Sequence, residues 1–125
     1  MSRELSIGVD HHEHAGCTVI SVAGDIDHNS SELLRETIER LISEYRSRIV
    51  IDAQKITFCD STGLRVLLSG ARMTSEAGGW LRLAEVSDVL GRLLQITGLS
   101  AWFPVDTDVA ASLTQAAPRD LRLPD

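Results

Sequence analysis

The feature that most constrains the fold is a short, unbroken apolar run, IVI at residues 49–51, which follows an amphipathic segment. Such a run is typical of a central strand that is covered on both faces of a sheet. In the segment before it, one face recurs at helical spacing: Leu33, Leu34, Thr37, Ile38, Leu41, Ile42 and Tyr45. A helix that leads into a buried strand is the crossover of a parallel pair, so we expect a mostly parallel sheet.

An antiparallel hairpin is expected at the N-terminus. Leu5, Ile7 and Val9 alternate with polar or small residues, which is the period of a half-buried strand. Residues 17–23 are rich in β-branched side chains and follow a possible turn at residues 15–16. We therefore expect these two segments to pair.

Three more helices and two more strands are predicted after the central run. Their limits come from capping residues, glycines and prolines. The expected segments are a helix that begins near Asp60 or Ser61, has its apolar face over 64–75 and is ended by Gly78 and Gly79, a strand over 80–84, a helix from Ser87 to Gly98, a brief strand at 102–103, and a helix that starts at Asp106 or Thr107 and ends before Pro118.

The order of elements is thus ββαβαβαβα, which predicts one α/β domain with an N-terminal antiparallel hairpin, right-handed crossovers and about four helices. A chain of 125 residues with 43% hydrophobic residues can bury a core without disulfides or a metal. We expect the domain to span residues 1–117 and residues 118–125 to form a flexible tail.

Charge and cysteine usage restrict the partners and the compartment. The net charge of −6 argues against nucleic acid, because contacts to phosphates need clustered Lys and Arg. Cys17 and Cys59 have no metal-type spacing and are expected to be buried thiols in a reducing compartment. The N-terminus lacks a signal-peptide pattern, and no window approaches the roughly 20 apolar residues of a membrane span, so we expect a cytoplasmic protein without membrane contact.

Three kinds of chemical site are weighed and disfavoured. The HHEH run could hold a metal, but on a strand His11 and His12 point to opposite faces and only His12 and His14 share one, so we expect no metal. No glycine-rich phosphate loop is present, and the glycines lie at helix ends. A serine hydrolase using Ser61 stays open as an alternative, although "CDSTG" is not the GxSxG elbow of such enzymes.

The stretch FCDSTGLRVLL places polar side chains where a helix begins after a strand. Asp60 or Ser61 can accept a hydrogen bond from the free amides of the first turn. One cap does not account for Asp, Ser, Thr and Gly in series. The free amides and partial positive charge of a helix N-terminus are also compatible with a phosphate on Ser61.

Three segments, GDIDHNSSELL, IVIDAQKITFCDSTGLRVLL and LLQITGL, resemble the STAS domain of bacterial anti-sigma factor antagonists, which control sporulation and general-stress sigma factors. The similarity runs from about residue 5 to about residue 117. In that family, an anti-sigma factor that is itself a serine kinase phosphorylates the serine directly after the aspartate. The resemblance therefore implies phosphorylation at Ser61, with Thr62 as a possible second site.

The resemblance also implies a partner switch. The unmodified protein would bind the anti-sigma kinase and free the sigma factor, phosphorylation would end that binding, and a serine phosphatase would restore it. Such a protein is not an enzyme and has no cofactor, since ATP and Mg²⁺ belong to the kinase. A STAS module that serves as a scaffold in another signalling assembly is the alternative with the same fold.

The expected partner surface combines the helix start at residue 60 with the loop GDIDHN before the first helix. Its candidate residues are Asp25, Asp27, His28, Asn29, Asp60, Ser61, Thr62, Gly63 and Arg65. Residues of the GDIDHN loop could equally serve as turn and cap residues, with Asn29 or Ser30 capping the helix and Glu32 completing a capping box.

Two positions in this surface have specific interpretations. Gly63 is expected to be small because a partner approaches the backbone closely there. Arg65 stands where the best-known members of the family have glycine, so it could touch the partner or the phosphate.

Overall fold

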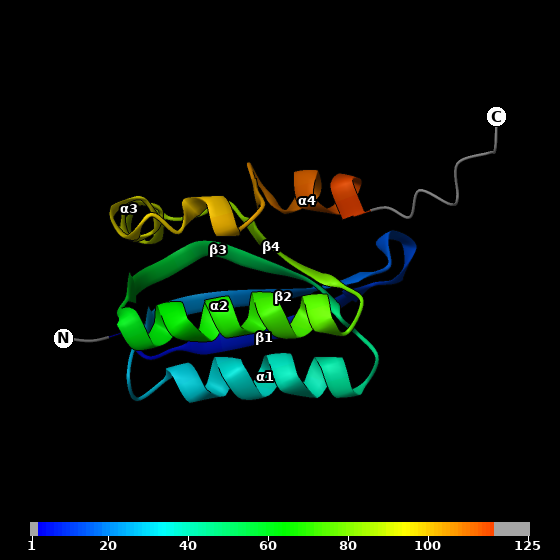
Figure 1. The fold of residues 1–125 in the computed structure, drawn as a ribbon, viewed down its shortest axis with the longest axis horizontal. Helices are drawn as coiled ribbons and strands as arrows, with labels where there is room; N and C mark the ends of the chain where they lie inside the picture. Colours follow the sequence, from blue (N-terminus) through cyan, green and yellow to red (C-terminus); the bar gives the residue numbers. More distant parts are fainter. Residues whose placement is uncertain (1–2, 117–125) are drawn as a thin grey trace.

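The computed structural model describes residues 3–116, which form a five-stranded sheet with strand order β1-β2-β3-β4-β5 (Figure 1). The strands are β1 Ser6–His12, β2 Cys17–Ile26, β3 Arg48–Cys59, β4 Trp80–Ala84 and β5 Val105–Asp106. The helices are α1 Ser31–Ser43, α2 Ser61–Glu76, α3 Asp88–Thr97 and α4 Val109–Ala116, with short 3-10 turns at Glu13–Ala15 and Ser100–Trp102. β1 is antiparallel to β2 and the other neighbours are parallel, which confirms the predicted hairpin and α/β class.

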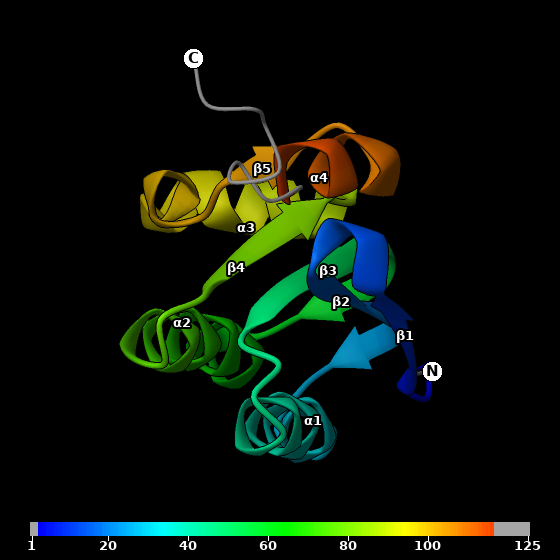
Figure 2. The same ribbon diagram turned by 90° about the vertical axis from the view of Figure 1, so that its right-hand side faces the viewer.

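The helices are divided unequally between the two faces of the sheet (Figure 2). α1, α2 and α3 lie along one face and α4 lies on the other. Along β3, Ile49 and Ile51 belong to the large core cluster under the three helices, whereas Val50 packs into the smaller cluster with Ala116 of α4. All three residues of the run at 49–51 are fully buried, so the predicted central strand is confirmed.

β3 is much longer than the predicted strand. It continues from the apolar run to Cys59, while β4 pairs only with its first five residues, 48–52. The second half pairs with β2 alone, with register shifts between Ser21 and Ala23 and between Gly24 and Asp25. These irregularities break the alternation of apolar and polar residues, so the sequence pattern resembles a loop.

The fifth strand does not lie where the sequence pattern put it. Residues expected to form a strand at 102–103 instead end a 3-10 turn, and Trp102 is 68% exposed. β5 follows at Val105–Asp106 and pairs with Leu83 and Ala84 of β4. Aromatic residues favour strands in general, but here one aromatic side chain is left at the surface.

The limits of two helices also differ from the expectation. α1 ends at Ser43, and Tyr45, expected on the buried face, has a positive φ of 64° and is 97% exposed. α4 begins at Val109, and its first turn is capped by Asp108, whose carboxylate accepts a hydrogen bond from the Ala111 N–H at 2.8 Å. Asp106 forms a bidentate pair with Arg82 instead. The expected tail at residues 118–125 lies outside the described residues.

Candidate functional site

The two segments that the sequence assigned to one surface do meet in the structure. They leave the sheet at the carboxyl ends of neighbouring parallel strands, where Ile26 at the end of β2 is paired with Cys59 at the end of β3. The Asp60 N–H donates a hydrogen bond to the Ile26 carbonyl at 3.2 Å. The loop before α1 and the start of α2 therefore lie side by side, at the left of Figure 1.

Asp60 joins these two segments through one carboxylate. Its Oδ1 accepts a hydrogen bond from the Gly63 N–H at 2.9 Å, which confirms the predicted N-cap of α2. Its Oδ2 accepts one from the His28 N–H at 3.1 Å, across 32 positions of sequence. The cap of one helix is thus also the anchor of the loop that leads into another.

Ser61 and Thr62 provide the hydroxyls of the site. Ser61 is exposed and is the first residue of α2, and Thr62 is half-buried. Between residues 3 and 116, neither hydroxyl has a hydrogen-bond partner, whereas the nearby carboxylates of Asp27 and Asp60 do. The Ser61 hydroxyl is therefore accessible at a helix N-terminus, where the partial positive charge favours an anion.

Gly63 is buried, and its small size has a cause within the fold. A Cβ at this position would lie 2.7 Å from both the side chain and the carbonyl oxygen of Ile26, and 2.9 Å from the Cys59 sulfur. Contacts this short do not occur in real structures without a shift of the backbone. The packing of α2 on the strand ends is therefore sufficient to require a glycine here, and the close approach of a partner stays a prediction.

Asp25 is also buried. It is 9% exposed, and its Oδ1 accepts a hydrogen bond from the Thr57 hydroxyl at 2.6 Å. Its Oδ2 accepts one from the Arg3 N–H at 2.8 Å. The carboxylate ties the N-terminal segment to β2 and β3, so we assign it a structural role in place of the expected partner contact.

Asp27 organises the entry into α1. Its Oδ1 accepts hydrogen bonds from the N–H groups of Asn29 at 2.9 Å and Ser30 at 3.0 Å. The Ser30 N–H and then the Ser30 hydroxyl hold the pKa of Asp27 below its ordinary value. The capping box expected between Asn29 and Glu32 is not formed: the N-cap of α1 is Ser30, and no side chain of the described residues caps the first turn.

The remaining candidates are available at the surface. His28 and Asn29 are exposed, and their side chains make no hydrogen bond within the described part of the chain. Arg65 is exposed on the second turn of α2 and forms no ion pair with any residue between 3 and 116.

Phe58 belongs to this surface, and the sequence analysis missed it. The side chain lies at the end of β3, opposite Asp25 in the strand register, and is 46% exposed. Exposed aromatic residues are typical anchors of protein interfaces. An aromatic residue two positions before the helix cap was a signal in the sequence, but its exposure depends on the irregular pairing of β2 with β3. We call Phe58, His28, Asn29, Ser61, Thr62 and Arg65 the 28/61 surface.

Cys59 lies beneath this surface as a packing group. Burial, followed by the negative charge of Asp60, raises the pKa of its thiol to about 12. The thiol is therefore neutral near pH 7 and is a poor nucleophile. Cys17 is also buried, so the expectation of two buried free cysteines is confirmed.

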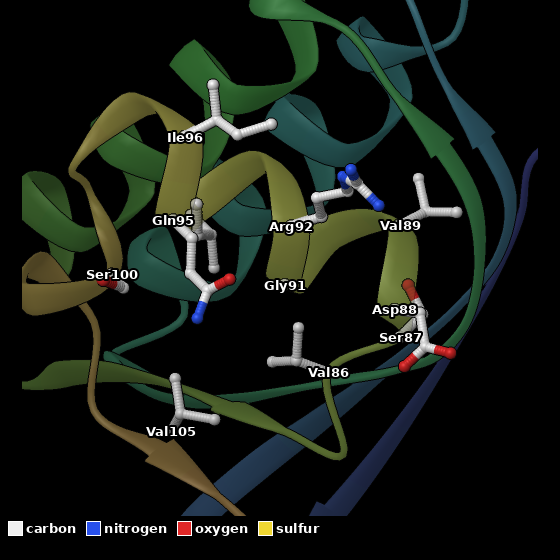
Figure 3. A pocket seen from close by; sticks show the side chains of 11 residues that line it. Val86, Ser87, Asp88, Val89, Gly91, Arg92, Gln95, Ile96, Ser100 and Val105 are labelled. Carbon is white, nitrogen blue, oxygen red and sulfur yellow. The ribbon is translucent and has the colours of Figure 1, made fainter.

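A groove along α3 is a second surface feature, which the sequence did not predict (Figure 3). It encloses about 990 Å³. Val86, Val89, Ile96 and Val105 contribute apolar side chains, and Asp88 and Arg92 are the charged groups among its described lining residues. The groove shares no lining residue with the 28/61 surface.

Among residues 3–116, no helix combines the length and the apolar character that a bilayer crossing needs.

A family model supports the similarity noted from the sequence motifs. The STAS domain model matches residues 9–112. The anti-sigma-B factor antagonist of Bacillus subtilis is 35% identical over 95 residues, which cover 76% of this chain and 86% of that protein. Proteins of this kind are regulators of transcription.

Solved structures share the fold. An anti-sigma factor antagonist from Mycobacterium paratuberculosis superposes with a TM-score of 0.81 at 24% identity, covering 92% of this chain and 96% of that one. SpoIIAA of Bacillus, solved in unphosphorylated and phosphorylated forms, gives TM-scores of 0.72 and 0.67 at 23% identity. The match covers 86% of this chain in both cases, and 93% and 96% of the respective SpoIIAA chains. Motifs, family model, sequence relatives and fold agree: the chain belongs to the STAS domain family and, within it, to the anti-sigma factor antagonists.

Proposed function

We propose that this protein binds an anti-sigma factor serine kinase while Ser61 is unmodified, and thereby frees a sigma factor. Phosphorylation of Ser61 by that kinase ends the binding, and a serine phosphatase restores it. The protein performs no catalysis and carries no cofactor, and it acts in the cytoplasm. The domain over residues 1–117 is the working unit, with Thr62 as a secondary acceptor.

One observation carries this proposal: Ser61 is exposed, and its hydroxyl has no hydrogen-bond partner among the described residues, on a helix start that is otherwise held firmly. Asp60 caps the helix, and Gly63 packs it directly against Ile26 and Cys59. An acceptor hydroxyl must be reachable by a kinase, whereas its surroundings must keep one shape for recognition. The region around Ser61 satisfies both needs.

Charge alone is sufficient for the switch. A phosphate adds about −1.5 to −2 charges at neutral pH. At ~5 Å and an effective dielectric of ~20, each like-charge pair in the interface costs roughly 3 kcal/mol, about two decades of affinity. The 28/61 surface can therefore be inactivated without refolding of the domain.

The test compares two variants of Ser61 in calorimetric titrations with the cognate anti-sigma kinase at fixed salt. Ser61→Ala should keep the affinity of the wild type, whereas Ser61→Asp should weaken it by roughly one to two decades. Ser75→Asp is the matched control, because it adds the same charge to an exposed position far along α2. Equal affinities for Ser61→Ala and Ser61→Asp would place Ser61 outside the interface and end the proposal.

The site of modification is tested separately. Incubation with the same kinase and MgATP should add one phosphate, and peptide mass spectrometry should locate it on Ser61. Phosphate found only on Thr62, Ser69 or Ser75 would overturn the assignment. Failure of the purified kinase to bind, with a different protein retained from cells, would favour the scaffold alternative.

A further inference from the structure

Arg65 lies one helical turn after the proposed phosphorylation site and has no ion-pair partner among residues 3–116. We propose that Arg65 is a positioning residue that binds the phosphate of phosphorylated Ser61 within the same chain. The inference rests on the proposed function in one respect, namely that Ser61 is the residue that carries the phosphate.

The helix α1 shows what an arginine does at this spacing when acids are present. Arg35 donates a hydrogen bond from Nε to Glu32 at 3.1 Å and from Nη1 to Glu39 at 2.8 Å. These glutamates lie three residues before and four residues after the arginine. An arginine on a surface helix of this protein therefore reaches acidic groups one turn away in either direction.

Around Arg65 the same two positions carry hydroxyls in place of acids, Thr62 three residues before it and Ser69 four residues after it. Ser61 lies four residues before Arg65, which is the other spacing that brings side chains together across one helical turn. Asp60, the nearest carboxylate in the sequence, accepts the amides of His28 and Gly63. Arg65 is thus arranged as Arg35 is, except that its acidic partner is absent until a hydroxyl is modified.

Distance and exposure both permit the pair. Ser61 and Arg65 are both exposed on α2, and residues four apart on a helix have Cβ atoms about 5–6 Å from each other. A guanidinium binds phosphate oxygens through two parallel hydrogen bonds, which lysine cannot do. The phosphate would then be held along the first turn of α2, where the helix N-terminus also favours it.

The other charged groups of the region act in both directions. Asp27 and Asp60 lie at the same end of the sheet and repel a phosphate, whereas His28 attracts it when protonated. Within the 28/61 surface, Arg65 is the residue with a permanent positive charge. It therefore determines whether the phosphate stays close to α2.

The experiment uses the full chain with phosphoserine inserted at position 61 during translation, so that no kinase is needed. The phosphorus-31 NMR signal is followed against pH. The second pKa of the phosphate is then compared between the protein with the wild-type Arg65 and the Arg65→Gln variant. Pairing with Arg65 should make the pKa lower than in Arg65→Gln by about 0.15–0.35 unit. Arg65→Lys should recover part of this difference, because it keeps the charge but not the paired donors.

Two controls make the result specific. Arg72→Gln removes an exposed arginine farther along α2 and should leave the phosphate pKa unchanged. The series is repeated with His28→Gln, because histidine titrates in the same pH range. The inference would be overturned if the phosphate pKa were the same in the wild-type chain and in Arg65→Gln. It would also be overturned if Arg72→Gln changed that pKa as much as Arg65→Gln does. Neither result depends on kinase binding, so the proposed function would stand or fall by its own titration.

Discussion

The loop before α1 and the start of α2 lie side by side at one end of the sheet, yet they use their polar side chains differently. At the end of β2 and in the loop that follows it, the carboxylates of Asp25 and Asp27 accept hydrogen bonds from amides and hydroxyls. At the start of α2, the hydroxyls of Ser61 and Thr62 have no partner in the described chain. The difference separates residues whose side chains hold the segments in place from residues whose side chains are free to contact a partner.

The largest effect is expected where the start of α2 is itself structural. Gly63→Ala should lower the free energy of unfolding by about 3 kcal/mol, because its Cβ would collide with the Ile26 backbone, which cannot move without displacing β2. Gly91→Ala on α3 is the matched control. Its Cβ would lie 3.5 Å from the Val86 side chain, an ordinary contact, and alanine has a higher helix propensity than glycine. Urea unfolding measures both. Similar stabilities for the two variants would return Gly63 to the list of partner contacts.

The next test compares a buried residue at the end of β2 with an exposed residue in the loop before α1. Asp25→Ala should lower the free energy of unfolding by about 2 kcal/mol, since the Thr57 hydroxyl and the Arg3 amide lose a charged acceptor. Asn29→Ala, whose side chain makes no hydrogen bond in the described residues, should stay within about 0.5 kcal/mol of the wild type. Chemical denaturation measures the free energy of unfolding of both variants. An equal loss of stability would show that Asp25 and Asn29 do not differ in structural role.

Phe58 extends the comparison from polar to apolar side chains. Phe58→Ala should weaken binding to the anti-sigma kinase about tenfold, or ~1.4 kcal/mol, as expected for an aromatic anchor. Its half-exposed ring contributes only about 1 kcal/mol to folding. Ile96→Ala, in the groove along α3, is the control and should bind normally. If Ile96→Ala lowers the affinity more than Phe58→Ala, the groove and not the 28/61 surface is the interface.

The smallest effect concerns the titration of Asp27. The pKa of this carboxyl is lowered mainly by the Ser30 N–H and then by the Ser30 hydroxyl, so Ser30→Ala should move it part of the way back towards 3.8. Because the folded pKa is lowered, this carboxylate adds stability above the ordinary value of 3.8 and loses that contribution as the pH falls through the lowered value. Carboxyl carbon-13 NMR follows the titration. Ser43→Ala, at the other end of α1, should leave it unchanged, and an equal shift there would exclude the Ser30 hydroxyl as the cause.

Sequence patterns predicted the parts of the fold that are regular. The parallel crossover was predicted from the fully buried run at 49–51 and the amphipathic stretch that forms α1. In both segments the spacing of apolar residues in the sequence matches the side chains that the structure buries. The extension of β3 to Cys59 escaped prediction, since it pairs with β2 across two register shifts that break the period. β5 escaped because a strand of two residues has no period to detect.

Within the site, residue type indicated the place but not the role. Asp60 was foreseen as a cap, whereas its second hydrogen bond, to His28, depends on the pairing of β2 with β3. Asp25 and Gly63 looked like contact residues because their burial depends on segments distant in sequence, such as Thr57 for Asp25 and Ile26 for Gly63. Tertiary contacts decide which polar side chains form hydrogen bonds within the domain and which remain available at its surface.

The carboxylate of Asp60, shared between two segments, has a consequence for the rate of signalling. The segments that it joins are already fixed relative to each other before any partner arrives, so association loses little conformational entropy. Docking of preformed surfaces proceeds at about 10⁵–10⁷ M⁻¹s⁻¹, with no slow rearrangement in between. On the proposed function, the lifetime of the signal therefore depends on how fast phosphate is added to and removed from Ser61, and not on any relaxation of the domain.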